Sequence, residues 1–295
     1  MQTKLKIPLV IASDDDYEYC RKLYHKMGRT FYIATRLTPK KYHKRIDAIY
    51  GFARLADEWV DNPGDMPFGQ IEQRLTEYQS ELVKACKGNI SHFPTIRAFS
   101  EVVMETGMSL EEPILFLETM RSDLYKARYE TYEDLCHYMR GSASSIGLML
   151  CHIFEPESNE QIKDAAITIG LNLQYTNFLR NIKEDAERGR IYLPLEDLEQ
   201  FGVTEASILE SHYTDQFKEL MKFECNRNKR IHGYTMKHLQ DLPIDLQKPA
   251  KTASYLYSFY LTEIEKQNYH VFKKRPSISD FKRLIGKIKV NLGMI

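Results

Sequence analysis

The 295-residue sequence has no net charge, no apolar run long enough to span a bilayer and no paired cysteines. Its 41 basic and 41 acidic side chains cancel, whereas a protein that holds nucleic acid by bulk charge would carry a basic excess. The longest apolar stretches, such as Ile146 to Phe154, fall well short of the roughly 20 residues of a membrane-spanning helix. Residues 1–16 place a proline inside a short apolar patch and offer no convincing cleavage site. We therefore expect neither a signal peptide nor a membrane span.

Cysteine excludes two further classes of structure. The five cysteines are scattered and include no CxxC pair: Cys20, Cys86, Cys136, Cys151 and Cys225. An odd, unclustered set is typical of packed thiols in a reducing compartment and does not fit a disulfide framework or a zinc site. With 43% hydrophobic and 28% charged residues, the chain has enough apolar surface for a core. We expect a cytoplasmic globular protein.

Hairpin signals of the Asn-Gly or Asp-Gly type are also missing, and helical periodicity takes their place. Apolar residues recur at every third or fourth position, as in Leu117, Met120 and Leu124. We predict an all-α chain with helices near residues 14–28, 40–61, 69–87, 92–106, 110–125, 131–152, 159–187, 211–240, 248–268 and 278–291. Residues 188–210 and 241–250 are predicted as ordered loops with short helical turns. No linker divides the chain, so one domain over residues 1–295 is the simplest organisation.

The segment YGFARLADEWVD at residues 50–61 predicts an acidic helix end. Four polar side chains share one face of this helix: Tyr50, Arg54, Asp57 and Asp61. Asn62-Pro63-Gly64 follows and ends the helix. Both carboxylates thus lie in the last turn, where the macrodipole disfavours an anion by roughly 0.3–1 kcal/mol. A bound cation would reverse the sign of that effect.

A second long helix ends in a similar way, at QYTNFLRNIKEDAERGRIY (residues 174–192). Its polar face carries Gln174, Asn177, Asn181 and Asp185, and Gly189 is a C-terminal cap. Asn181 and Asp185 repeat the four-residue spacing of Asp57 and Asp61. Oxygen ligands without His or Cys are typical of a site for a hard cation such as Mg²⁺.

Arginines accompany both acidic faces: Arg54, Arg180, Arg188 and Arg190. Carboxylates that hold Mg²⁺, together with arginines that make bidentate anion contacts, are what a diphosphate site needs. The alternative for any single DxxxD is a solvated helix face, which is common. Two such ends occur together, and spacing alone leaves both a functional site and a solvated face open.

Small residues dominate the segment YMRGSASSIGLML at residues 138–150. They are Gly141, Ser142, Ala143, Ser144, Ser145 and Gly147. Two interpretations have equal weight: close helix–helix packing, or space for a long apolar ligand. The 19 tyrosines and 14 phenylalanines could line such a space and stabilise a carbocation through their ring faces, although core packing is the default for any one ring.

Three segments resemble the squalene/phytoene synthase family. They are DEWVD at 57–61, MRSDLYKARYETYEDLCHYMRGSASSIG at 120–147 and QYTNFLRNIKEDAERGRIYLP at 174–194. The resemblance runs in the same order from about residue 30 to residue 272, and YMRGSASSIG with RIYLP is most similar to bacterial and archaeal phytoene synthases. It implies an all-α isoprenoid-synthase bundle around a central cavity, in which Mg²⁺, or alternatively Mn²⁺, holds two prenyl diphosphates for head-to-head condensation.

The resemblance also implies roles for particular residues. The implied metal ligands are Asp57, Asp61, Asn181 and Asp185. The implied diphosphate-binding residues are Tyr50 and Arg54 on the first helix, and Gln174, Asn177, Arg180 and Arg190 on the second side. Phe31, Ala143 and Gly147 would border the chain tunnel, and Tyr192 and Tyr257 the reaction centre. Asp123 is either an extra carboxylate of the site or a residue of a helix surface.

The reaction implied is the joining of two geranylgeranyl diphosphates to phytoene, through a cyclopropylcarbinyl diphosphate and without NADPH. One alternative is a squalene or dehydrosqualene synthase that uses farnesyl diphosphate. A second is a non-catalytic binding or assembly protein, because Asn181 stands where the family pattern has aspartate. The asparagine removes one negative charge. Glu184 is an imperfect substitute, because it is next to Asp185 in the sequence and points roughly 100° away from it on an ideal helix. Asparagine at position 181 therefore implies one of three outcomes: weaker metal binding with activity kept, a shifted step in the mechanism, or loss of catalysis.

Substrates and products of this kind are lipids, so peripheral contact with a membrane is a further expectation. The neutral composition gives it no direct support, and no basic amphipathic helix is evident. The basic residues between Arg21 and Arg29 are one candidate contact, with a solvated face as the alternative. Nothing in the sequence sets an oligomeric state or indicates a nucleic-acid partner.

Overall fold

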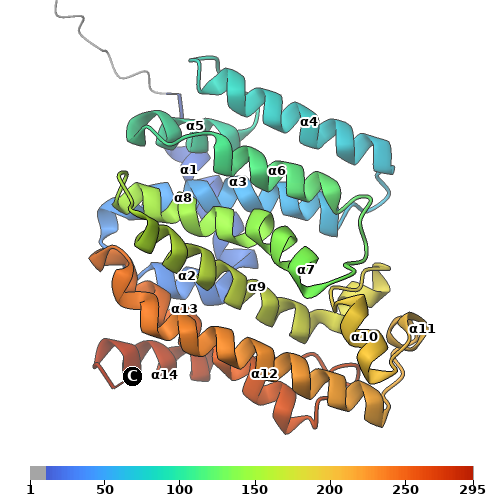
Figure 1. The fold of residues 1–295 in the computed structure, drawn as a ribbon. Helices are drawn as coiled ribbons and strands as arrows, with labels where there is room; N and C mark the ends of the chain where they lie inside the picture. The colour runs from blue at the N-terminus through green and yellow to red at the C-terminus, as the bar shows by residue number, and fades with distance from the viewer. Residues whose placement is uncertain (1–10, 295) are drawn as a thin grey trace, which may run out of the picture.

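A computed structural model describes residues 11–294 as helices joined by loops, with no strand in that range (Figure 1). Residues 1–10, which bear on the question of a signal peptide, lie outside the described part of the chain. No helix within residues 11–294 is both long enough and apolar enough to cross a membrane. The predicted all-α class is confirmed.

Nine helices of the described range have at least twelve residues. They are α1 (Asp14–Met27), α3 (His43–Asp61), α4 (Phe68–Ala85), α5 (Pro94–Thr106), α6 (Glu111–Ser122), α9 (Glu160–Glu187), α12 (Asp215–His238), α13 (Ile244–Lys266) and α14 (Asp280–Asn291). Shorter helices connect them: α2 (Arg29–Thr35), α7 (Tyr132–Met139), α8 (Ser145–Phe154), α10 (Leu195–Phe201) and α11 (Glu205–Leu209). Each long helix overlaps a predicted one. The short α2 was not predicted, because seven residues are too few for a periodic pattern.

The predicted helix over residues 131–152 is divided in the structure. A π-helical turn over Arg140–Ser144 separates α7 from α8. Small residues allow close packing at this turn: a Cβ on Gly141 would lie 1.9 Å from the Thr119 Oγ1 of α6. On the other side, a Cβ on Gly170 of α9 would lie 2.7 Å from the Ser144 Cα. The turn therefore fits between two helices that side chains of ordinary size would hold apart.

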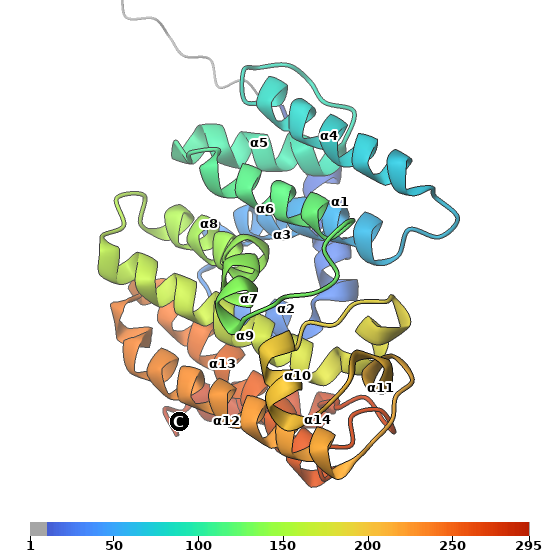
Figure 2. The same ribbon diagram turned by 45° about the vertical axis from the view of Figure 1, so that its right-hand side comes forward.

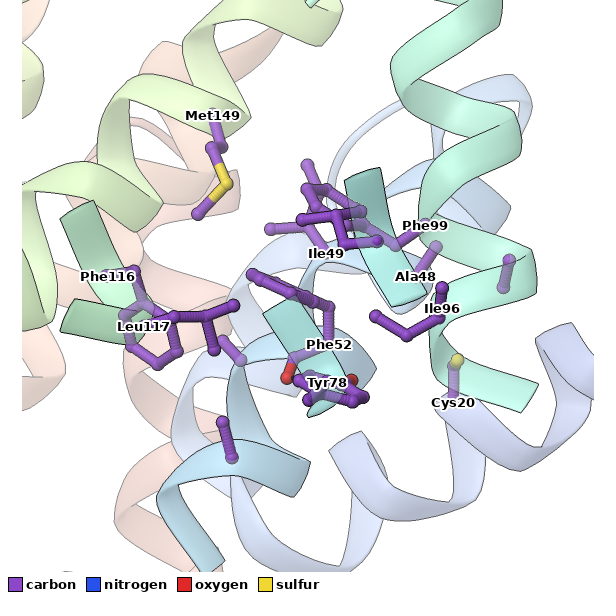
Figure 3. Close-up of a cluster of buried hydrophobic side chains, with 14 of the residues drawn as sticks. Cys20, Ala48, Ile49, Phe52, Tyr78, Ile96, Phe99, Phe116, Leu117 and Met149 are labelled. Carbon is purple, nitrogen blue, oxygen red and sulfur yellow. The ribbon is translucent and has the colours of Figure 1, made fainter. Parts of the chain in front are cut away.

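The helices are stacked in layers, with α4 at one end of the molecule and α14 at the other (Figures 1 and 2). Helix α9 crosses the middle and packs against α8, α12 and α13. A hydrophobic core on the α4 side is centred on Phe52 of α3, which stacks on Phe99 of α5 with 4.3 Å between ring centroids (Figure 3). A second core forms around α9 and α12. Packing on both sides fixes α3 and α9, the two helices that carry the acidic motifs.

Candidate functional site

A polar cavity of about 630 Å³ opens where the ends of α3 and α9 meet. Seven basic side chains line it: Lys26, Arg29, Arg54, Arg180, Arg188, Arg275 and Arg283. Four acidic side chains also line it: Asp57, Asp61, Asp123 and Asp185. Seven positive against four negative charges leave an excess of three positive charges on the wall. Such a wall attracts an anionic ligand.

An apolar cavity of about 200 Å³ adjoins the polar one. None of the described residues that line it is charged. It includes Ala143 and Gly147 from the small-residue segment, together with side chains of α2, α3, α9 and α13. The two cavities share five lining residues: Phe31, Tyr50, Gln174, Asn177 and Tyr257. The small residues thus allow close packing, and Ala143 and Gly147 among them also line this cavity.

Arginines hold the two carboxylates at the end of α3. Arg54 forms an ion pair with Asp57 and also donates to the Glu58 Oε2 at 2.7 Å. From the second motif, Arg190 Nη1 donates to the Asp61 Oδ1 at 2.7 Å, and Arg188 Nε donates to the Asp61 carbonyl at 3.1 Å. These contacts join the end of α3 to the end of α9 and bring cations to a helix C-terminus, where they are favourable.

The carboxylates repel one another across the cavity. Burial and the neighbouring Asp61 raise the pKa of Asp57 above its ordinary value. Burial and the same Asp61 raise the pKa of Asp185 to about 8. Because Asp61 is the neighbouring charge that most strongly raises the pKa of both Asp57 and Asp185, the two acidic motifs form one electrostatic unit. A divalent cation bound among these oxygens would remove the repulsion.

Asn181 faces the polar cavity, and an arginine already contacts it. Arg275 Nε and Nη2 donate to the Asn181 Oδ1 at 3.0 and 2.6 Å. The same guanidinium lies 3.2 Å from the Glu184 Oε1. Arg275 belongs to the loop between α13 and α14, where no sequence pattern singles it out. In this arrangement the amide oxygen of Asn181 accepts two hydrogen bonds and has no lone pair left for a cation.

The donor set fits Mg²⁺ when a diphosphate supplies the remaining ligands. No three Asp, Glu, His or Cys side chains in residues 11–294 converge closely enough to form a metal site by themselves. Mg²⁺ is commonly held by one or two carboxylates together with substrate phosphates and water. Asp57, Asp61 and Asp185 line the same cavity and offer carboxylate oxygens, which are the ligands that Mg²⁺ requires from the protein.

Aromatic rings form the wall between the carboxylates and the interior. Tyr192 stacks on Phe178 with 4.1 Å between ring centroids, and Tyr257 meets Phe31 edge to face at 6.3 Å. Asp123, 7% exposed, accepts a hydrogen bond from the Tyr138 hydroxyl. Burial raises the pKa of Asp123 to about 7. Asp123 is therefore part of the cavity wall and not of an exposed helix surface.

The structure brings the predicted site residues together, with one difference. All of them line the polar or the apolar cavity except Arg190, which lies behind Asp61 and holds its carboxylate. Several lining residues were not predicted: Lys26, Arg29, Tyr138, Phe178, Tyr260, Arg275 and Arg283. Tyr138 lies in the small-residue segment and could have been predicted from it. The four unpredicted basic residues lie outside the acidic motifs, on α1, α2 and α14 or in loops, where no local signal marks them.

Comparison with known proteins gives a consistent result. Residues 24–282 match the family described as squalene/phytoene synthase. The chain is 32% identical to a phytoene synthase of Arthrospira platensis, over 92% of this chain and 91% of that protein. It is 33% identical to a 15-cis-phytoene synthase of Synechocystis, over 92% and 83%. Among solved structures, a dehydrosqualene synthase superposes with a TM-score of 0.84 at 26% identity, covering 95% of this chain and 96% of that one.

Proposed function

Because the chain belongs to the squalene/phytoene synthase family, we propose that it condenses two geranylgeranyl diphosphates head to head to give phytoene, with residues 1–295 acting as one domain. The observation that carries the proposal is the junction of a positively charged cavity with an uncharged one. A prenyl diphosphate has the same two parts, an anionic head and a long apolar chain. The relatives from Arthrospira platensis and Synechocystis are phytoene synthases, which supports the choice of product.

The arginines would bind and orient the diphosphates. Arg54 lies beside the first acidic motif, and Arg180 and Arg275 lie beside the second. A planar guanidinium donates two parallel hydrogen bonds to phosphate oxygens, which fixes the direction of the leaving group. Arg190 would act indirectly, by holding the Asp61 carboxylate in place.

The metal would be held by Asp57, Asp61 and Asp185, with Asn181 as a fourth ligand only if Arg275 moves away from it. When bound, Mg²⁺ neutralises the charge of the diphosphate as it leaves. The same four residues would accept Mn²⁺, which also prefers oxygen ligands.

The shared residues at the junction would protect and guide the reacting carbons. Tyr50 is stacked on Tyr24 with 3.7 Å between ring centroids, and Phe31 meets Tyr257 edge to face. Ring faces stabilise a cation, and a packed aromatic wall keeps out the water that would quench it. Ala143 and Gly147 would leave space for the apolar chain beyond the junction.

Dehydrosqualene formation from farnesyl diphosphate is the second candidate. It is favoured by the structural match to a dehydrosqualene synthase, at 26% identity over nearly the whole of both chains. The two candidates differ in chain length and share the diphosphate-binding residues.

The deciding experiment is incubation of the purified protein with geranylgeranyl diphosphate and Mg²⁺, without NADPH, followed by chromatography of the extracted lipid. We expect a forty-carbon hydrocarbon. A thirty-carbon product obtained only from farnesyl diphosphate would establish the second candidate. Unreacted substrate in both assays, with and without NADPH, would contradict the proposal and favour a non-catalytic role.

A further inference from the structure

Helix α14 exposes a continuous apolar stripe. Phe281, Leu284 and Ile288 are 70%, 55% and 46% exposed, and Leu292 just beyond the helix is 69% exposed. Spacings of three and four residues put these side chains on one face. The opposite face packs on the molecule, since Val290 is buried and a Cβ on Gly286 would lie 2.6 Å from the Leu256 Cδ2 of α13.

The segment that carries the stripe has an excess of basic residues. Residues 281–294 contain four basic and no acidic residues, although the whole chain is neutral. At the start of the helix, Lys282 pairs with Glu263 of α13 and Arg283 pairs with Asp280, the first residue of α14. An exposed apolar stripe with lysines on the same helix is typical of helices that lie in the interface of an anionic membrane.

The position of α14 relates the stripe to the polar cavity. Arg283, one turn into the helix, lines that cavity and donates to the Thr30 Oγ1 of α2 at 3.2 Å. Arg29, also on the cavity wall, lies 3.4 Å from Asp280 at the start of α14. The apolar stripe therefore begins beside the cavity that would receive an amphiphilic substrate.

We propose that α14 is a membrane-contact helix that inserts the side chains of Phe281, Leu284, Ile288 and Leu292 into the surface of an anionic bilayer. The contact goes beyond the proposed condensation and does not depend on catalysis. It would place the polar cavity close to the lipid headgroups, so that a lipid diphosphate could pass from the bilayer to the arginines without crossing bulk water.

A bilayer fits this surface better than a second copy of the chain. The stripe is only one helix wide, and pairing two copies would bring two basic segments together, which is unfavourable. The basic residues of α1 fit the role less well, because Tyr19 is the one large apolar side chain that α1 exposes, and this helix therefore has no apolar stripe to insert. The proposed contact thus lies on α14, whereas the sequence alone suggested the basic residues between Arg21 and Arg29.

The test is flotation of the full-length protein with vesicles of phosphatidylcholine, with or without phosphatidylglycerol, in the absence of substrate. The variant is Leu284→Glu/Ile288→Glu. The matched control is Phe68→Glu/Ile90→Glu, which makes the same change at two exposed apolar residues near the ends of α4, on the far side of the molecule. Light scattering of each protein reports self-association, and circular dichroism reports folding.

We expect the wild type and the control to float with the anionic vesicles, and the α14 variant to lose binding by about tenfold or more while remaining folded. Wild type that binds neither kind of vesicle would overturn the proposal, as would equal losses in variant and control. A wild-type dimer that the α14 variant converts to a monomer would overturn it in favour of a subunit interface. The condensation assay in detergent is independent: vesicle binding without product would leave this proposal intact and contradict only the proposed function.

Discussion

The two cavities differ in how their walls are stabilised without a ligand. The apolar cavity is lined by uncharged side chains that also belong to the surrounding cores, such as Ile49 and Leu173. The polar cavity gathers four carboxylates and seven basic groups, and the pKa of Asp185 is raised to about 8 there. The apolar wall is thus favourable as it stands, whereas the polar wall keeps unfavourable interactions that a cation and a diphosphate would relieve. A region that is costly when empty is one built for a ligand.

The largest effect should come from removing a carboxylate of the polar cavity. We expect Asp57→Ala or Asp61→Ala to lower kcat by at least about 10²–10³-fold, because the charge on the departing diphosphate would no longer be neutralised. The melting temperature should stay near the wild-type value. Product assays and circular dichroism check both statements, with Asp65→Ala on the exposed loop after α3 as the matched control. An active double variant would contradict the metal assignment.

Filling the apolar cavity should separate chain length from diphosphate binding. We expect Ala143→Phe to lower kcat/KM for the twenty-carbon substrate by about a hundredfold, because the chain would be displaced from its reactive position. Inhibition by inorganic pyrophosphate, which reports on the polar cavity, should be unchanged. The volume-conserving Ile146→Leu, on the same wall, should change activity by no more than about twofold. Weakened pyrophosphate inhibition in Ala143→Phe would show that the two cavities are not separable.

The polar cavity should also make stability depend on pH. Asp123 has a pKa of about 7 when folded, above its ordinary value of 3.8. The folded state therefore holds this proton more tightly than the unfolded state, and stability falls as pH rises from about 4 through 7. At about 1.4 kcal/mol per pKa unit, we expect the metal-free protein to lose roughly 3 kcal/mol of unfolding free energy from this group over that range.

The measurement is urea unfolding at several pH values for the wild type, Asp123→Asn and the exposed control Asp65→Asn. The loss should be smaller in Asp123→Asn, which stays neutral at every pH, and unchanged in the control. An identical pH dependence in all three proteins would show that Asp123 is not the responsible group.

The smallest effect should follow Asn181→Asp. Arg275 lies 2.6 Å from the Asn181 Oδ1 and would form an ion pair with the new carboxylate. The added charge and the added ion pair oppose one another, so activity should be kept or rise by no more than about threefold, with a lower Mg²⁺ requirement. Titration of activity against Mg²⁺ measures both quantities. A loss of more than about tenfold would show that the amide has a role that a carboxylate cannot fill.

Local signals determined a large part of this protein. The periodicity of apolar residues located the long helices, and the spacing of Asp57 and Asp61 and of Asn181 and Asp185 placed two polar faces at helix ends. Both kinds of signal depend on residues within a few turns of one another, and the geometry of a helix converts such spacings directly into faces. The family resemblance then supplied the pairing of the two faces across one cavity.

Contacts between distant segments decided the rest. Arg275 reaches Asn181 across 94 residues, Arg190 reaches Asp61 across 129, and Arg283 reaches Thr30 across 253. No spacing rule predicts such contacts, because they depend on how the helices pack. The exposure of the α14 stripe is of the same kind: a helical sequence pattern gives a face its apolar character, but only the packing of α14 on α13 decides that Gly286 and Val290 face inward and leave Leu284 and Ile288 in solvent.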